Sequence, residues 1–454
     1  MRQVFVRYTV TILFILTIIA LADAAPLITG SSRGSNSSSN SSISINENDE
    51  KFQQRITLDV GYLQPIIFSN RAVGEFGIGY VHAFSWLFDI PGDALSKNKK
   101  DPLSSIIRGG LAIGSFFLMD YLPVGKWMLP YHEFGHGTRI AAAGYEPIYY
   151  YVSSFSNKGG WDGPYTNYFM YFISGLFSSK SGGVTSSLGN SVVGGAGVPN
   201  YWWAVGSMGG MNNEMYFAEI LEDDIYYNGG HLTYAAFYYE GKLAAYDYVQ
   251  ATKGGAFGST LIGDIGNIIG YYNSKGYGIG LSTIETASLI SLILSSSTYS
   301  LLYSGYNFAV NGDPTVRGFE IYNFRIPDIN LYLTSKGLSY QIKSAYRYKD
   351  VTFPISLEMV FAGGFGMDLG FGIRKEYTKG NGQKLILQGG AILNIPEVTG
   401  IGLNGYAKWV SKKNAYALGL FLHNLNNFEG ERHITNLAFG PFGVDIVANY
   451  TLYY

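Results

Sequence analysis

The last third of the chain alternates apolar and polar residues with a period of two, and this pattern limits the fold more than any other feature. Between residues 365 and 374, Phe, Met, Leu, Phe and Ile alternate with Gly, Asp, Gly, Gly and Arg, and runs at 338–348 and 416–423 behave alike. Turn-forming segments separate these runs at 335–337, 379–382 and 412–414. Because successive side chains of a strand point to opposite faces, the runs predict antiparallel strands, roughly eight of them in residues 313–454.

The same alternation begins near the start of the chain, in residues 53–90. Ile56 and Leu58 alternate with Thr57 and Asp59, which predicts one strand. Four further apolar residues predict a second strand at even positions: Phe76, Ile78, Tyr80 and Phe84. The chain is therefore expected to hold strands at both ends of its sequence.

Few charges accompany these strands. Charged residues make up 14% of the chain, whereas glycine and tyrosine number 59 and 38. Strands rich in Gly and aromatic residues with few charges fit a sheet that touches lipid or packs tightly. The final strand has an unbroken apolar face at alternate positions from Val444 to Tyr454. Together these features resemble a bacterial outer-membrane β-barrel protein. The resemblance implies an antiparallel barrel of about 10–12 strands, although a soluble sandwich or a sheet packed on helices remains the alternative.

The first residues predict export. Residues 1–24 combine a charged start, a short apolar core and Ala22-Asp23-Ala24, the pattern of a secretory signal peptide. Residues 25–52 are rich in Ser and Asn and predict a flexible linker. With the barrel resemblance, this favours the outer membrane of a Gram-negative bacterium, with a periplasmic or secreted protein as the alternative.

The middle of the chain, residues 91–312, loses the alternation and predicts a helical region. Helix-length stretches lie at 104–122, 128–143, 212–227, 231–250 and 283–303. A Gly-rich segment at 181–197 predicts a loop. We therefore expect an α+β fold in which a large helical insert lies between two strand regions.

One helix of this region carries a strong chemical motif at residues 132–136, His-Glu-Phe-Gly-His. His132 and His136 are one helical turn apart, so both imidazoles can reach one metal ion. Glu133 would lie beside that ion, where it can accept a proton from a bound water. The chain has only six histidines, which makes a chance match rare. A pair of structural histidines on a helix is the simpler alternative.

This segment resembles the H-E-x-x-H signature of the zincin metallopeptidases. The resemblance implies Zn²⁺ as the cofactor, a peptide or protein substrate, and Glu133 as the general base for water activated by zinc. The metzincin branch requires Gly and His where this chain has Arg139 and Ala142, so that branch is excluded.

A catalytic zinc needs a third protein ligand. Residues 210–214, Gly-Met-Asn-Asn-Glu, resemble the segment that supplies a Glu ligand in the thermolysin-like gluzincins, which makes Glu214 the expected third ligand. The family has Asp four residues later where this chain has Ala218. Glu219 and Glu222 therefore remain alternatives, and Asn213, Asp223 and Asp224 are candidates to hold the ligand imidazoles.

The same family stabilises its oxyanion with a downstream His or Tyr. His231 is the remaining histidine of the helical region, so we expect it as a catalytic residue, with Tyr226 and Tyr227 nearby. A His near the start of a helix also serves structural roles.

Two classes of function follow. The first is an exported, membrane-associated zinc metallopeptidase; the alternative is a structural outer-membrane barrel with a helical plug and a non-catalytic metal site. A third possibility is a soluble exported binding protein with a zinc-stabilised core. A net charge of −2 argues against a nucleic-acid partner.

Overall fold

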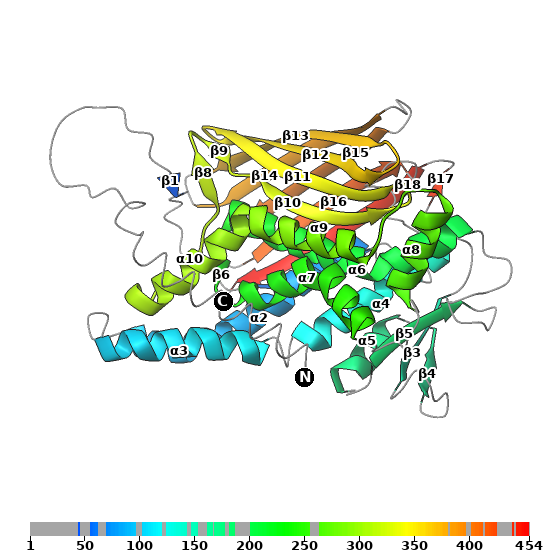
Figure 1. Ribbon diagram of the computed structural model, residues 1–454. Helices are drawn as coiled ribbons and strands as arrows, with labels where there is room; N and C mark the ends of the chain where they lie inside the picture. Colours follow the sequence, from blue (N-terminus) through cyan, green and yellow to red (C-terminus); the bar gives the residue numbers. More distant parts are fainter. Residues whose placement is uncertain are drawn as a thin grey trace.

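The protein is a mixed α+β structure, seen in a computed structural model (Figure 1). The residues described are 44–45, 55–61, 70–96, 102–119, 124–142, 147–152, 161–166, 168–177, 181–186, 200–254, 263–379, 382–395, 401–411, 414–424, 438–439 and 442–453. The expected signal peptide and nearly all of the linker lie outside these residues. The α+β class expected from the sequence is confirmed.

A large antiparallel sheet forms one layer of the molecule. Its long strands are β2 (Arg55–Gly61), β10 (Asp328–Thr334), β11 (Gly337–Tyr348), β12 (Val351–Gly363), β13 (Met367–Thr378), β14 (Lys384–Ile395), β15 (Ile401–Val410), β16 (Asn414–Asn424) and β18 (Phe442–Tyr453). Short strands extend its margins: β1 (Ser44–Ile45), β8 (Phe319–Ile321), β9 (Phe324–Arg325) and β17 (Ala438–Phe439). Consecutive strands from β10 to β16 pair as neighbours, β18 follows β16, and β2 pairs with β18. The predicted C-terminal strands and the predicted strand at residues 56–62 are therefore confirmed.

The sheet is open rather than closed. Among the described strands, β2 and β10 form the two edges and do not pair with each other. Helix α6 (Asn200–Asn228) lies along the β10 edge, where the Asn212 amide donates to the Leu333 carbonyl at 2.8 Å and accepts from the Leu333 N–H at 3.0 Å. One side chain thereby satisfies backbone groups that a neighbouring strand would otherwise bond. The closed barrel expected from the sequence is not found among the described strands.

The two faces of the sheet have inverted polarity. The outer face exposes large apolar side chains, including Phe371 (51%), Leu403 (50%) and Leu418 (59%). The inner face, toward the helices, buries polar and charged residues such as Glu358 and Arg374. A sheet in water normally shows the opposite arrangement, with its polar face outward.

Helices cover the inner face and build most of the core (Figure 1). They are α2 (Asn70–Ser96), α3 (Pro102–Met119), α4 (Gly125–Ala142), α5 (Tyr168–Phe177), α6, α7 (Tyr234–Lys253), α8 (Asp264–Ser274), α9 (Leu281–Leu294) and α10 (Ser296–Asn311). Aromatic side chains dominate the centre of the helical layer, where Trp127 of α4 packs on Tyr131 and Phe217. Among the described helices, none combines the length and apolar composition needed to cross a lipid bilayer.

The second strand expected in residues 53–90 is wrong, because α2 occupies that segment. Phe76, Tyr80 and Phe84 are spaced by four residues, so they share one face of a helix as readily as one face of a strand. Tyr80 stacks on Trp127 and meets Phe84 edge-on, which places this aromatic row in the core. Tertiary packing thus decided between two patterns that the sequence allowed.

The middle region also differs in detail. The expected helix at 283–303 is two helices, α9 and α10, because Ser295 has an extended backbone between them. A three-stranded sheet also lies in this region: β3 (Pro147–Val152), β4 (Trp161–Tyr165) and β5 (Ser181–Ser186). Strand β5 occupies the start of the segment expected to be a loop, and residues 187–197 of that segment lie outside the described part of the chain. Helix α8 was not predicted, and it contributes a residue to the site below.

Candidate metal centre

Helix α4 brings together the residues of the motif at 132–136. His132 and His136 lie one turn apart, with their Nε2 atoms 3.0 Å from each other. Both rings and the Glu133 side chain are buried. The helical spacing expected from the sequence is therefore present, and the two imidazoles converge on one point.

Glycines allow α4 and α6 to approach closely at this point. A Cβ on Gly135 would lie 2.2 Å from the Gly209 carbonyl oxygen, and one on Gly210 would lie 2.2 Å from His132 Nε2. Only residues without a side chain permit such contact between helix backbones. The glycine inside the motif thus sets the distance between the motif helix and α6.

Polar side chains then fix the two helices in register. Asn213 of α6 donates to the Tyr131 carbonyl at 3.0 Å, and its own oxygen accepts from Arg139 at 3.0 Å. Arg139 also donates to the Gly135 carbonyl at 3.0 Å. Asn213 was expected as a partner of the ligand imidazoles; it instead holds the backbone of α4.

Each imidazole is oriented by a hydrogen bond at its Nδ1 atom. His132 Nδ1 donates to Glu214 Oε1 at 2.9 Å, and His136 Nδ1 donates to the Gly206 carbonyl at 2.6 Å. Because a carbonyl only accepts, the proton of a neutral His136 must reside on Nδ1. Such bonds to carboxylates and carbonyls fix the tautomer and orientation of metal-binding histidines and leave Nε2 for the metal.

Asp264, at the first position of α8, completes the group. Its Oδ2 atom lies 3.3 Å from His136 Nε2 and 3.9 Å from His132 Nε2. One nitrogen from each histidine and one oxygen of Asp264 all lie within 4.8 Å of one another. The Asp264 side chain is 21% exposed, so it is the member of the group that faces solvent. This set of two imidazoles and one carboxylate is suited to a divalent metal ion.

The structure brings Asp264, and not Glu214, to the point where the two Nε2 atoms converge. Glu214 was expected as the third ligand, but it bonds His132 at Nδ1, on the opposite side of the ring from the point where the two Nε2 atoms converge. Its position is that of an orienting partner, and Asp264 takes the place expected for it. Sequence reasoning missed Asp264 because α8 was not predicted; its position directly after Gly263 at the start of a helix was the available signal.

The other expected site residues lie elsewhere. His231 sits in β6 (Gly230–His231), beyond the end of α6 at Asn228, which is ~21 Å along the helix from Glu214 at 1.5 Å per residue. Its Nδ1 lies 3.0 Å from the Thr233 hydroxyl, and its ring packs edge-on against Phe88. The structure thus does not bring His231 to the two histidines. The alternatives and partners considered at 219, 222, 223, 224, 226 and 227 also lie on later turns of α6.

Tyr248 of α7 is a site residue that the sequence did not single out. Its ring stacks on His132 at 5.1 Å between centroids, and its hydroxyl lies 2.7 Å from His132 Nε2. Burial raises the pKa of Tyr248 well above its ordinary value, with the nearby carboxylates adding to the effect. A neutral phenol that can donate a hydrogen bond therefore lies beside the converging nitrogens.

The charges of the group act strongly on one another. Burial alone would lower the pKa of His132, but Glu214 and Asp264 overcome this and raise it well above the usual value. Burial alone would raise the pKa of Asp264, but the two histidines hold it well below its usual range. Burial raises the pKa of Glu133, and the histidine charges offset part of that shift. Positive charge between these residues is therefore strongly favoured, either as protons or as a metal ion.

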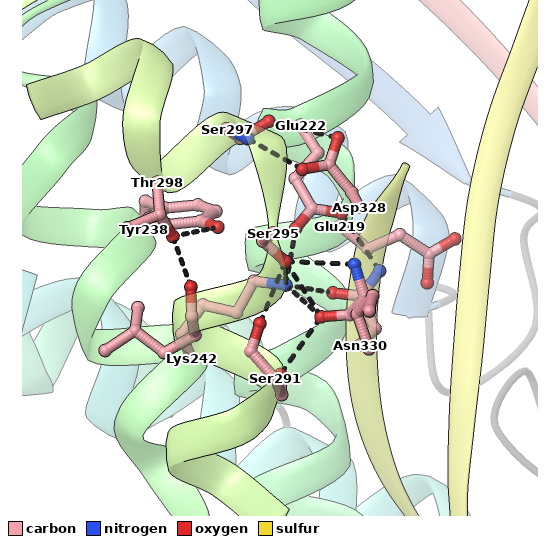
Figure 2. A network of polar contacts seen from close by, with 12 residues as sticks. Glu219, Glu222, Tyr238, Lys242, Ser291, Ser295, Ser297, Thr298, Asp328 and Asn330 are labelled. Carbon is pink, nitrogen blue, oxygen red and sulfur yellow. Dashed lines mark hydrogen bonds and ion pairs between the residues drawn. The ribbon is translucent and has the colours of Figure 1, made fainter. Parts of the chain in front are cut away.

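A second buried polar cluster lies further along α6 (Figure 2). Lys242 of α7 contacts Glu222 of α6 at 2.5 Å, and neither side chain is exposed. The same ammonium group donates to Asn330 Oδ1 at 2.7 Å and to Ser295 Oγ at 3.0 Å. The cluster ties α6 and α7, which carry Glu214 and Tyr248, to strand β10 and to the junction of α9 and α10.

Comparisons with known proteins give no assignment for this site. A scan against protein-family models, a search of curated proteins and a search of solved structures each found no match for this chain.

Proposed function

We propose that this chain is an exported, membrane-associated zinc-dependent peptidase. The observation that carries the proposal is the convergence of His132 Nε2, His136 Nε2 and Asp264 Oδ2 beside a buried glutamate that directly follows the first histidine. Two imidazoles, one carboxylate and a neighbouring glutamate are the parts that metal-assisted hydrolysis requires. The motif at 132–136 supports the same reaction class.

The donor set fits zinc. Zinc in catalytic sites binds three protein ligands of the His and carboxylate type and leaves one position open. Here both Nδ1 atoms are occupied by acceptors, so both Nε2 atoms are directed to a common point. Zinc bound there by His132, His136 and Asp264 would supply a Lewis acid that lowers the pKa of water to about 7.

The remaining residues would handle protons and charge. Glu133 would accept a proton at its carboxylate, since burial raises the pKa of this group and makes it a better base. The Tyr248 hydroxyl would donate a hydrogen bond to the negative charge that develops on the peptide oxygen. Glu214 and the Gly206 carbonyl would keep the two imidazoles oriented throughout.

Metal analysis of purified variants tests the ligand assignment. We expect the wild type to bind zinc, and His136→Ala and Asp264→Asn to lose it, whereas Glu214→Gln should bind about 10–100-fold more weakly, as loss of an orienting partner does. Loss of zinc in Glu214→Gln with retention in Asp264→Asn would restore Glu214 as the ligand. A wild type that binds no divalent metal would refute the site.

Activity against a broad peptide library tests the reaction. Glu133→Gln should keep its zinc and lose about 10²–10⁴-fold in rate, the usual contribution of a general base. Bound zinc without any peptide cleavage in the wild type would favour the alternative, a structural membrane protein with a non-catalytic metal site. Equal rates for the wild type and Glu133→Gln would exclude the proposed base.

The membrane part of the proposal is supported by the polarity of the sheet. Rows of apolar side chains cross the outer face, and one row pairs Leu385 with Trp409, Trp409 with Tyr416 and Tyr416 with Tyr450. Lipid-facing strands carry such an apolar band with aromatic residues at its border. The eleven residues of β14 from Leu385 to Ile395 span ~34 Å, or ~26 Å at a tilt of 40°, which matches the ~25 Å band of outer-membrane strands.

Site-directed labelling tests this surface, because the chain has no cysteine of its own. A spin label at Leu418→Cys, on the outer face, should be accessible to dissolved oxygen and shielded from a water-soluble nickel chelate after reconstitution into phospholipid vesicles. The matched label at Gln388→Cys, which lines the inner face, should not show this preference. Equal exposure of Leu418→Cys to the nickel chelate with and without vesicles would contradict the proposal.

A further inference from the structure

A polar chamber lies between the inner face of the sheet and helices α2 and α6. Its volume is about 270 Å³, near the lower end of the ~300–1,000 Å³ of ligand pockets. On α6 it is lined by Tyr216, Glu219 and Asp223, whereas Gly206, Gly210 and Glu214 approach the histidines of α4. The chamber is therefore distinct from the candidate metal centre.

Acidic and basic residues line opposite walls of the chamber. All the acidic residues of its lining belong to the helices: Glu75, Glu219, Asp223 and Asp224. Four of the five basic residues belong to the sheet side: Arg325, Lys343, Arg374 and Lys408. The fifth, Arg71 of α2, lies over the ring of Phe421 at 3.9 Å. A negative helical wall thus faces a positive strand wall across the chamber.

At one end the walls come close enough to pair directly. Lys343 of β11 contacts Glu219 at 3.0 Å and Asp223 at 2.6 Å, and Arg325 contacts Asp223 at 2.8 Å. Lys343 shares a cross-strand row with Ser356, Gly370 and Ile392. These ion pairs fix the width of the chamber at this row.

Further along the strands the basic side chains continue. Arg374 lies four residues beyond Gly370 on β13, ~13 Å at 3.3 Å per residue. Its guanidinium lies 4.4 Å from the Tyr227 ring centroid and 3.1 Å from a Glu376 oxygen. Lys408 of β15 lies on the same wall, two strands away. The opposed charges therefore extend over a length that can accommodate a small ligand.

We propose that this chamber binds a small zwitterion, of the class of free amino acids and short unblocked peptides. The ligand's carboxylate would face Arg374 and Lys408 on the strand wall, and its ammonium would face Glu75 on the helical wall. A molecule with one charge of each sign complements both walls, whereas an anion or a cation complements one wall and is repelled by the other. The proposal stands independently of the zinc site, although short peptides are also what a peptidase would release.

Calorimetric titration of the full-length protein tests the proposal, with glycylglycine as the probe. Glycylglycine should bind measurably, and the neutral analogue N-acetylglycinamide should bind at least ~10-fold more weakly, since each lost charge contact is worth about a factor of ten. Lys408→Met and Glu75→Gln should each weaken binding about 10-fold. Lys375→Met should leave it unchanged, because Lys375 neighbours Arg374 on β13 but faces outward, near Asp350.

Two results would overturn the proposal. One is equal affinity for glycylglycine and its neutral analogue. The other is unchanged affinity in both Lys408→Met and Glu75→Gln, with folding verified by circular dichroism. Asp264→Asn should retain glycylglycine binding, so failure of the zinc site and failure of the chamber give different results.

Discussion

Two buried clusters of ionisable residues lie a few turns apart along α6, and they differ in how their hydrogen bonds are completed. In the group of His132, His136 and Asp264, each imidazole is bonded at Nδ1, and the remaining acceptors point at one another. In the cluster of Lys242 and Glu222, the ammonium faces acceptors on several sides. The second cluster contains its own cation, whereas the first favours a proton or a metal ion between its acceptors.

Under the proposed function, this difference distinguishes the metal centre from a structural element. Converging acceptors in a buried place repel each other unless a proton or a metal ion lies between them. In a buried ion pair, internal contacts offset only part of the desolvation of the two charges. Glu214 of α6 and Tyr248 of α7 contact His132, so the cluster of Lys242 and Glu222 joins the two helices that carry these contacts.

The largest effect on stability is expected when the ion pair of Lys242 and Glu222 is broken. Lys242→Met leaves Glu222 buried without its cation and should lower the free energy of unfolding by about 3–5 kcal/mol. Urea denaturation measures this. The matched control is Lys253→Met on the same helix, whose ion pair with Glu285 is partly exposed and should be worth under about 1 kcal/mol. Similar losses in the two variants would mean that the buried cluster has no special structural role.

The same cluster should give a pH dependence with a definite sign. Burial raises the pKa of Glu222 from 4.5 to about 7. Between these values the folded protein retains a proton that the unfolded chain has released, so this residue makes the unfolding free energy fall as the pH rises, by roughly 3 kcal/mol in total. Its contribution is complete below pH 4.5 and is lost as the pH passes through about 7.

Denaturation of the wild type and Glu222→Gln from pH 5 to pH 8 measures this contribution as a difference, in which the other titrating groups cancel. The difference should narrow or reverse as the pH rises. Glu285→Gln, which alters the partly exposed pair with Lys253, is the matched control. A constant difference in Glu222→Gln would contradict the assignment.

The stability of the group of His132, His136 and Asp264 should depend on metal instead. Zinc at a hundredfold excess over its dissociation constant should stabilise the wild type by about 2.7 kcal/mol, because only the folded state assembles the site. His136→Ala should show no zinc effect, whereas Lys242→Met should keep the full increment despite its lower stability. Denaturation with zinc and with a chelator gives both values. If zinc stabilised His136→Ala as much as the wild type, zinc would not bind at this group, and the proposed difference between the two clusters would be wrong.

Sequence reasoning predicted the parts of each region that depend on local spacing. His132 and His136 share a helix face by periodicity alone, and alternation predicted the strands from Leu338 onward. Asp264 could not be placed in the same way, because its contact with the histidines depends on how α8 packs against α6. The same reasoning explains α2, where a spacing of four fitted both structures and Trp127 in the core decided between them.

The smallest effect concerns the contact that holds the metal centre to α6. Gly135→Ala places a Cβ 2.2 Å from the Gly209 carbonyl, so α4 and α6 must separate, at a cost of about 1–3 kcal/mol for overpacking. Zinc affinity should fall as well, because Glu214 and the Gly206 carbonyl move away from the imidazoles that they orient. Gly270→Ala in α8 is the control: outside its own helix and chain neighbours no atom lies within 4 Å of its added Cβ, and the gain in helix propensity should stabilise the fold by about 0.5–1 kcal/mol with the zinc affinity retained. Calorimetry and urea denaturation of both variants separate the two roles. If Gly135→Ala bound zinc as tightly as Gly270→Ala, the orientation of the imidazoles would not depend on the contact between α4 and α6.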